Sequence, residues 1–415
     1  MKTKWTNELK MLLFTALLGA FVGVVLWCFL KAVGIVSAFF WDTLPEKTGM
    51  TFLSVPLCAA GGLVLGILHK IGGDYPDELT VVMDKIKKDK HYDYKPMIFI
   101  LLCAFLPLVL GASVGPEAGL TGIIAGLCYW IGDNVKYAKQ HETAYSRIGE
   151  AVMLGELFHM PLFGIIAVEE NEEDRDGFDT GISKGSKFLL YGIAAAAGYL
   201  TVLALNNLLG AASEGFPMFE MEKAGGTDFA LMLLYIPVGV LLCLFFQGAE
   251  KLSERAALKV PCILRETLCG LLVGIVMLFA PMALFSGEEE MRVFMTDYGT
   301  YAPLFMIGIC FLKLFMTAFC IRFGLKGGHF FPVIFSCVLM GFAIAALIFQ
   351  GADGHGIFAA GIITAAALGA QLKKPAAASA LLLLCFPVRM ILWLFIAAAV
   401  GSRITQAAAA KKTER

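Results

Sequence analysis

The stretch LVLGASVGPEAGLTGI, residues 108–123, decides the fold because it interrupts a long apolar run. That run, PMIFILLCAFLPLVLGASVGPEAGLTGIIAGLCYWIG at residues 96–132, has Glu117 as its only charged residue. As one straight helix the run would be about 55 Å long, whereas the hydrocarbon core of a bilayer is about 30 Å thick. The run therefore breaks at GASVGPE, where Pro116 suits the first turn of a new helix and Glu117 suits the positive end of its dipole.

The composition indicates a membrane protein. The chain has 415 residues, of which 58% are hydrophobic and 16% charged, and its mean hydropathy is +0.76. A soluble domain carries about a quarter charged residues. Apolar runs of membrane-spanning length recur along the chain, and examples are residues 11–41, 188–212, 229–247, 270–285, 303–320, 331–350 and 376–401. Because helices satisfy every backbone polar group in lipid, these runs predict an all-α polytopic membrane protein.

Charge and cysteine usage exclude several classes of protein. The net charge is −1, so no broad basic surface indicates a nucleic-acid partner. Both chain ends are basic, MKTKWTNELK and KKTER, which predicts cytoplasmic termini in a cell membrane. The first apolar run lacks a small-residue cleavage pattern, so we expect it to be retained. The eleven cysteines lie mostly in apolar runs without metal-ligand spacing, which indicates packing residues.

A second interruption resembles the first. FGLKGGHFFPVIFSC, residues 323–337, again places glycines and a proline, Pro332, between two apolar runs. The number of residues from Pro116 to Pro161 is nearly the same as the number from Pro332 to Pro375. This similar spacing is weak evidence for an internal duplication, and the alternative is that it arose by chance. Paired interrupted helices in two halves indicate a substrate site at the repeat interface. The expected organisation is a single membrane domain, 1–415, with approximate repeats at 11–211 and 226–406.

Interrupted helices whose amino ends meet in the membrane favour anions. Their first backbone N–H groups and the positive ends of their dipoles attract negative charge, and glycine lets an ion approach the backbone. Three stretches fit this description: GGDYP at 72–76, GASVGPE at 111–117 and GGHFFP at 327–332. A cation site would need carbonyls or several buried carboxylates, and Glu117 is the only carboxylate inside the spans of the first half. We therefore expect an anion.

The order GGDYP, ASVGP, GGHFFP resembles the CLC family of chloride channels and transporters, whose anion-coordinating loops read GSGIP, GKEGP or GREGP, and GxFxP. FHMPLFGIIAVEE, residues 158–170, is similar to the family's proline-led helix that ends in two glutamates. The resemblance implies an inverted repeat of tilted and broken helices, transport of an inorganic anion such as chloride through a lipid bilayer, a homodimer and no organic cofactor. It assigns to the anion pathway Gly72, Gly73, Asp74, Tyr75, Pro76, Val114, Gly115, Pro116, Glu117, Gly328, His329, Phe330, Phe331 and Pro332.

The departures from the family pattern bear on mechanism. Val114 stands where the family has a glutamate that competes with the anion and carries protons in antiporters. Gly73 replaces the serine of GSGIP, and no tyrosine follows Tyr301 to match the family's pore-lining tyrosine. No regulatory domain is expected after the last helix. These departures predict an uncoupled, channel-like mechanism.

Other interpretations stay open at this point. Glu117 either stabilises a helix dipole or takes part in conduction or gating, and Glu170 is either a proton acceptor or part of a solvated acidic run. The alternative function is a proton-coupled chloride or fluoride antiporter that uses these two glutamates. His329 is either pH-sensitive or structural. Without an intramembrane His/Asp/Ser constellation, we do not expect an enzyme. By resemblance, the dimer interface would involve residues 161–168, 188–209 and 376–399.

Overall fold

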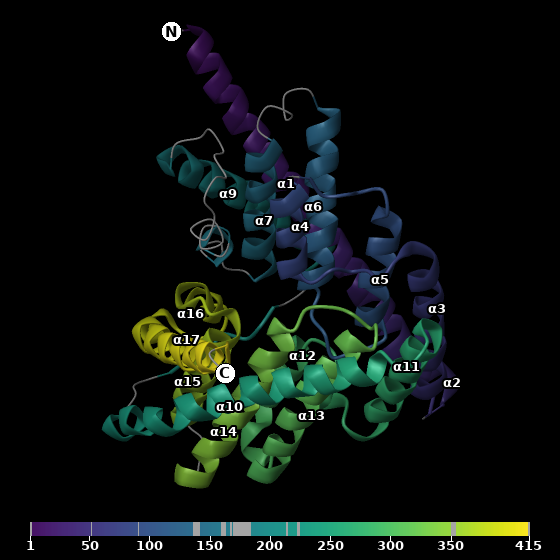
Figure 1. Ribbon diagram of the computed structural model, residues 1–415, viewed down its shortest axis with the longest axis vertical. Coiled ribbons are helices and arrows are strands. Elements are labelled where there is room, and N and C mark those ends of the chain that lie inside the picture. The colour runs from purple at the N-terminus through teal and green to yellow at the C-terminus, as the bar shows by residue number, and fades with distance from the viewer. Residues whose placement is uncertain are drawn as a thin grey trace. The chain divides into compact units, whose positions relative to one another are not determined.

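The computed structural model describes residues 2–50, 52–89, 91–135, 142–158, 163–166, 168, 184–212, 215–221, 225–349 and 354–413. Most of these residues are helical, and the helices are joined by short loops (Figure 1). Within this part of the chain, nine helices are long and apolar enough to cross a membrane. The predicted all-α membrane fold is confirmed.

The chain forms two compact units that do not coincide with its two sequence halves. The first unit comprises Met1–Thr48, Gly72–Phe105 and Pro116–Glu214, and the second comprises Gly49–Ile71, Leu106–Gly115 and Gly215–Arg415. The segment Leu106–Gly115, which carries most of the first interruption, therefore packs with the carboxy-terminal half of the chain. The repeats at 11–211 and 226–406 remain a prediction.

The first unit is built around a long amino-terminal helix. Its helices are α1 (Lys2–Ala38), α2 (Leu44–Thr48), α4 (Leu79–Asp89), α5 (Met97–Val109), α6 (Glu117–Asn134), α7 (Glu142–Leu157) and α9 (Lys184–Leu209). Helix α1 continues into α2 through the π-helical turn η1 (Phe39–Thr43). The last turn of α5 belongs to the second unit. Helix α1 lies directly against α9, where Gly19 and Gly23 face the backbone of Ala194 and Gly198. Small residues allow this close approach of two membrane helices.

The second unit contains most of the carboxy-terminal half of the chain. Its helices are α3 (Ser54–Gly72), α10 (Gly226–Ala257), α11 (Cys262–Phe279), α12 (Glu288–Asp297), α13 (Pro303–Arg322), α14 (Phe330–Phe349), α15 (His355–Leu372), α16 (Pro375–Leu382) and α17 (Ile391–Thr413), with 3-10 turns η3 (Pro281–Ala283), η4 (Tyr298–Thr300) and η5 (Val388–Met390). Helices α14 and α15 are buried over most of their length. Helix α15 packs against α10, α14 and α17. Helices α14 and α15 therefore form the centre of the second unit, and the second interruption, at residues 323–329, leads into α14.

Two predicted spans were wrong in their bounds. Only residues 270–279 of the run 270–285 belong to α11, which begins eight residues before the run, directly after Pro261, and ends at Phe279. The helix includes the charged Glu266, whose side chain is buried and hydrogen-bonded. The run 376–401 is two helices, α16 and α17, separated at Pro387. The membrane-length helices α3 and α15 were not among the example runs, and many alanines and glycines keep the hydropathy of α15 low.

Candidate functional site

The first interruption lies between α5 and α6, as the length argument requires. Helix α5 ends at Val109 and α6 begins at Glu117, with Pro116 as its N-cap residue. Gly111 has φ +75°, a left-handed conformation that favours glycine, and it turns the chain out of the helix. Every residue of the loop is buried. This chain therefore holds non-helical backbone inside protein, the only surroundings in which such backbone is tolerated at membrane depth.

The second interruption repeats this construction between α13 and α14. Helix α13 ends at Arg322, and Gly324 turns the chain with φ +97°. Helix α14 begins at Phe330, and the N–H of Val333 donates to the carbonyl of His329 at 3.0 Å. In any helix, the N–H groups of the first turn lie outside the helix's own hydrogen-bond pattern. The loop thus ends in a helix start of the kind that attracts negative charge.

The two loops meet, although more than two hundred residues separate them. The N–H of Gly115 donates to the carbonyl of Gly328 at 2.8 Å, and the N–H of Gly328 donates back to the carbonyl of Gly115 at 2.7 Å. Gly327 lies against the side chain of Val114 so closely that it leaves no room for a Cβ atom. This antiparallel pairing joins the two predicted stretches ASVGP and GGHFFP at one buried point.

The pairing brings together the residues that lead into two helices. Helix α6 begins two residues after Gly115, and α14 begins two residues after Gly328. Neither loop, at 110–116 or 323–329, contains a carboxylate. Glu117, in the first turn of α6, is buried with 1% of its surface exposed. The N–H groups of Gly115 and Gly328 are used in the pairing, so the groups left for a ligand are the first N–H groups of the helices that follow. Helix starts reached through loops without a carboxylate suit an anion rather than a metal cation.

Three further contacts hold residues 110–113 of the first loop within the second unit, to which they belong. The hydroxyl groups of Ser113 and Thr317 of α13 lie 2.9 Å apart and share a hydrogen bond. The N–H of Phe285 donates to the carbonyl of Gly111 at 3.1 Å. The thiol of Cys58 on α3 donates to the carbonyl of Leu110 at 3.3 Å. The loop is therefore anchored at Leu110, Gly111 and Ser113.

The aromatic residues of GGHFFP lie in different surroundings. His329 is partly buried, and its ring centre lies 4.6 Å from that of Phe330 and 5.8 Å from that of Phe246. Phe331 is fully buried, 5.0 Å from the ring of Phe216. The contact with Phe216 gives Phe331 a packing role. Lining of the anion pathway by His329, Phe330 and Phe331 stays a prediction.

The stretch GGDYP belongs to the first unit and forms a tight turn after α3. Gly73 has φ +110°, and the N–H of Tyr75 donates to the carbonyl of Gly73 at 3.0 Å. Asp74 is exposed, whereas Pro76 is buried. Partial burial raises the pKa of the Tyr75 hydroxyl, so it stays protonated at neutral pH and keeps a hydrogen to donate. The pathway role of Gly72 to Pro76 also stays a prediction.

Some predicted residues lie outside the described part of the chain. Glu170, the predicted proton acceptor, is one of them, together with Glu169 before it and Pro161 of the expected dimer interface. No structural statement about these three residues follows.

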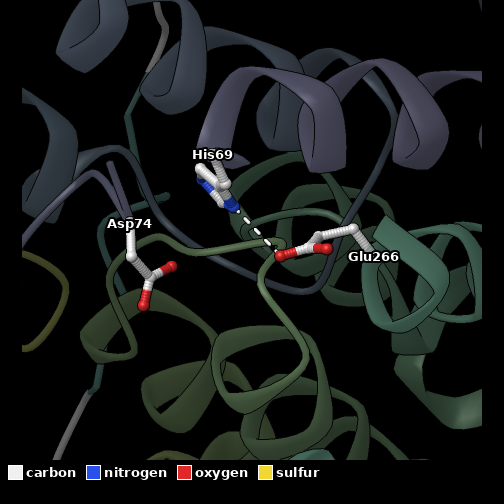
Figure 2. A group of neighbouring side chains, drawn as sticks. All are labelled: His69, Asp74 and Glu266. Carbon is white, nitrogen blue, oxygen red and sulfur yellow. Dashed lines mark hydrogen bonds and ion pairs between the residues drawn. The ribbon is translucent and has the colours of Figure 1, made fainter. Parts of the chain in front are cut away.

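Several buried charged groups escaped the sequence analysis, and two of them contact or adjoin the paired loops. One is Glu266 of α11, shown in Figure 2 with His69 of α3: the imidazole Nδ1 lies 3.1 Å from the carboxylate Oε1, and both side chains are almost fully buried. The other is Lys313 of α13, which has no exposed surface. Each charge interrupts an apolar helix, and at membrane depth that position alone is a signal of function.

The Glu266 carboxylate is occupied by cationic and polar partners. The guanidinium of Arg265 donates to Oε1 at 2.8 Å, and the thiol of Cys262 lies 3.4 Å from the same oxygen. Histidine and carboxylate are metal-binding residue types, but a guanidinium on the same oxygen repels a cation. Asp74, also drawn in Figure 2, belongs to the first unit. The group around Glu266 is therefore an ion-pair cluster that joins α3 to α11.

The fold and the paired loops together define the class of protein: it is a multi-pass membrane protein whose helices are interrupted between α5 and α6 and between α13 and α14. Comparison with known proteins identifies its family: the sequence profile described as Voltage gated chloride channel matches residues 69–406. The chain belongs to this family, the CLC family.

Named proteins that are similar to this chain are described as chloride channels. The chain is 24% identical over 297 residues to the voltage-gated ClC-type chloride channel ClcB of Escherichia coli, a match that covers 68% of this chain and 66% of ClcB. It is 23% identical over 348 residues to the chloride channel protein CLC-e of Arabidopsis thaliana, covering 77% of this chain and 47% of CLC-e. The chain thus spans about two thirds of the length of ClcB and about half of the length of CLC-e.

Solved structures share the fold. A CLC-type fluoride/proton antiporter superposes with a TM-score of 0.74 and 17% identity, covering 96% of this chain and 95% of that one. A slow cyanobacterial Cl−/H+ antiporter superposes with a TM-score of 0.76 and 17% identity, covering 95% and 94%. At this identity the likeness establishes the fold alone.

Proposed function

We propose that this protein conducts an inorganic anion, above all chloride, across a membrane by an uncoupled, channel-like mechanism. The pairing of Gly115 with Gly328 supports an anion site, because it joins two loops that each lead into a helix start. Membership of the voltage-gated chloride channel family supports the same substrate class. The pathway residues are those assigned by resemblance, with the backbone of the paired loops at the centre.

Val114 is the single observation that carries the uncoupled mechanism. Its side chain is fully buried in the paired loops, at the position where the family pattern has a glutamate. A valine has no titratable group, so it neither competes with the anion as a tethered carboxylate nor passes a proton. Anion movement through this site is therefore independent of proton movement.

Proton-coupled antiport of chloride or fluoride is the alternative. Two solved structures that share the fold are described as proton antiporters, one for fluoride and one for chloride. Buried Glu117 in the first turn of α6 is the described residue able to take part, and Glu170 would be the second. In this mechanism Glu117 exchanges a proton in each transport cycle.

The internal repeat is also part of the proposal. In each proposed half, at 11–211 and 226–406, a span (α3 or α11) is followed by a short polar helix (α4 or α12) and then by a loop between two apolar helices. This common order supports duplication. A homodimer in a cell membrane with cytoplasmic termini, and a transport role without catalysis, complete the proposal.

Flux from reconstituted vesicles tests the mechanism. Vesicles loaded with chloride should release it only after valinomycin supplies a potassium pathway, while external pH stays constant. Stoichiometric proton uptake driven by the chloride gradient would establish the antiporter instead. Absence of flux for chloride, fluoride, bromide and nitrate would overturn anion transport altogether.

A further inference from the structure

Lys313 is a buried charge that the paired loops do not explain. It lies within α13, a membrane-spanning helix, and none of its surface is exposed. Placing an ammonium group in the membrane interior costs several kcal/mol unless other groups compensate, so such residues face a functional cavity or pathway by default. The question is what compensates this one.

The described partners of Lys313 are neutral. Its Nζ donates to the carbonyl of Leu284 at 2.6 Å and to that of Phe285 at 3.2 Å, and it lies 5.4 Å from the ring centre of Phe335. An ammonium group has three hydrogens to donate. Among the described residues, two find carbonyl acceptors and no carboxylate hydrogen-bonds to the third. The positive charge is therefore solvated by dipoles and remains available to an anion.

Glu290 is the nearby acidic group, and it compensates Lys313 only in part. One of its carboxylate oxygens is buried and has no hydrogen-bond partner among the described residues. Burial raises the pKa of Glu290, although the ammonium of Lys313 acts against this rise. A raised pKa increases the neutral fraction of the Glu290 carboxyl group, and a neutral carboxyl group cancels less of the positive electric field of Lys313.

Lys313 stands next to the first paired loop through two connections. Phe285 accepts a hydrogen bond from Lys313 through its carbonyl and donates one to Gly111 through its N–H. On α13, Thr317 lies one turn after Lys313 and hydrogen-bonds Ser113. Side chains four residues apart on a helix lie about 5–6 Å apart at Cβ. The ammonium and the loop at 111–115 therefore belong to one connected group.

We propose that Lys313 is a specificity-determining residue of the anion pathway, where its fixed positive charge beside the loop at 111–115 draws anions toward the paired loops and excludes cations. This inference rests on the proposed anion conduction. It places a full charge, in addition to that of Lys326 in the second loop, beside helix dipoles that are each worth only about half a charge at a terminus. Binding to dipoles keeps the ion mobile, and Lys313 raises its local concentration.

Charge variants at position 313 separate this role from a structural one. Lys313→Arg keeps the charge, Lys313→Gln keeps a donor for the two carbonyls but removes the charge, and Lys313→Met removes both. A charge within about 10 Å at an effective dielectric of about 20 changes ion occupancy about ten-fold. We therefore expect Lys313→Gln to raise the half-saturating chloride concentration about ten-fold and to weaken anion-over-cation selectivity in the reversal potential. Lys313→Arg should stay near wild type.

Two further variants keep the test decisive. Glu290→Gln leaves the lysine in place and removes the opposing charge, so it should lower the half-saturating chloride concentration. The exposed Lys259→Gln, at the end of α10, is the matched control and should change nothing. Thermal unfolding in detergent is measured for every variant, because a merely structural lysine would move stability but not selectivity.

The outcomes are distinct. In one outcome the wild type conducts anions, and Lys313→Gln and Glu290→Gln have the same half-saturating chloride concentration and selectivity as the wild type. This result overturns the role of Lys313 and leaves the proposed function standing. Absence of anion flux in wild type overturns both. Opposite shifts in the two variants support the inference even where Lys313→Met fails to fold.

Discussion

The loop between α5 and α6 and the loop between α13 and α14 share one construction but differ in their surroundings. Each turns on a left-handed glycine, Gly111 or Gly324, and each ends in a helix start. A Cβ atom at Gly111 would meet the ends of the Met277 and Phe285 side chains, whereas one at Gly324 would meet the buried carboxylate of Glu266. The first loop is surrounded by apolar groups that can yield, and the second is held by an ion-pair cluster.

This difference indicates separate tasks for the two loops. The second loop is the rigid support, because Glu266 is fixed by His69 and Arg265 while Gly324 lies against it. The first loop carries Val114 and Ser113, the residues that depart from the family pattern or connect to α13. Changes at Gly324, where the support rests on Glu266, should mainly disturb the fold. Changes to the first loop, or to its pairing with the second, should mainly disturb transport.

Gly327→Ala breaks the pairing itself and should have the largest effect. The new Cβ would overlap Val114 and come within 2.9 Å of the carbonyl of Gly115. We expect anion flux to fall more than ten-fold, with a loss of about 1–3 kcal/mol in the free energy of unfolding, as for overpacked interiors. The double variant Gly327→Ala/Val114→Ala removes the side-chain overlap and should regain part of the flux. Wild-type flux in the single variant would show that close pairing is not needed.

Val114→Glu introduces a titratable group into the first loop. A carboxylate there competes with the anion, so flux at neutral pH should be about ten-fold lower than in the matched Val114→Gln variant. Glutamate has an ordinary pKa of about 4.3 and burial raises it, so flux should recover as pH falls and the group becomes neutral. Flux of the two variants measured from pH 8 to pH 4 checks this. Identical pH profiles would place position 114 away from the ion.

Gly324→Ala and Gly111→Ala compare the two turns directly. Both force a left-handed conformation on alanine, at about 1–2 kcal/mol. Gly324→Ala also displaces Glu266, so we expect a total loss of about 3 kcal/mol there and about 1 kcal/mol at Gly111. Thermal unfolding in detergent measures both. Equal losses would remove the distinction between support and adaptable loop.

Glu117→Gln should have the smallest effect. Removing a negative charge from the first turn of α6 favours an anion nearby, so flux at low chloride should rise about three-fold, while the helix loses about 0.3–1 kcal/mol of dipole stabilisation. Vesicle flux and proton uptake are measured together. A wild-type proton uptake that disappears in Glu117→Gln would instead assign proton exchange to this residue.

The sequence was sufficient to predict the breaks but not what lies around them. Run length against bilayer thickness, with Pro116 and Pro332 as markers, predicted two interrupted helices, and the structure contains both. Local signals are enough there because a helix break is a property of a few consecutive residues. A shared site for the two interruptions was inferred from the repeated helix breaks and from the family resemblance. The pairing of Gly115 with Gly328 was not predicted, since no local pattern encodes a contact over that separation.

The buried charges show where sequence reasoning stopped. Lys313 stood inside a predicted span and Glu266 just before another, yet neither was singled out. Their importance depends on what covers them: two carbonyls for Lys313, and His69 with Arg265 for Glu266. Such partners come from distant segments, so they become visible only when the tertiary structure is known.

A structure determined with bromide in place of chloride tests the central claim most directly. Bromide scatters X-rays anomalously, so its position can be read without interpretation of weak density. The account predicts an anomalous peak within hydrogen-bonding reach of the first backbone N–H groups of α14, next to Gly115 and Phe330. Bromide bound elsewhere in the protein, with the paired loops empty at a concentration that saturates flux, would contradict it.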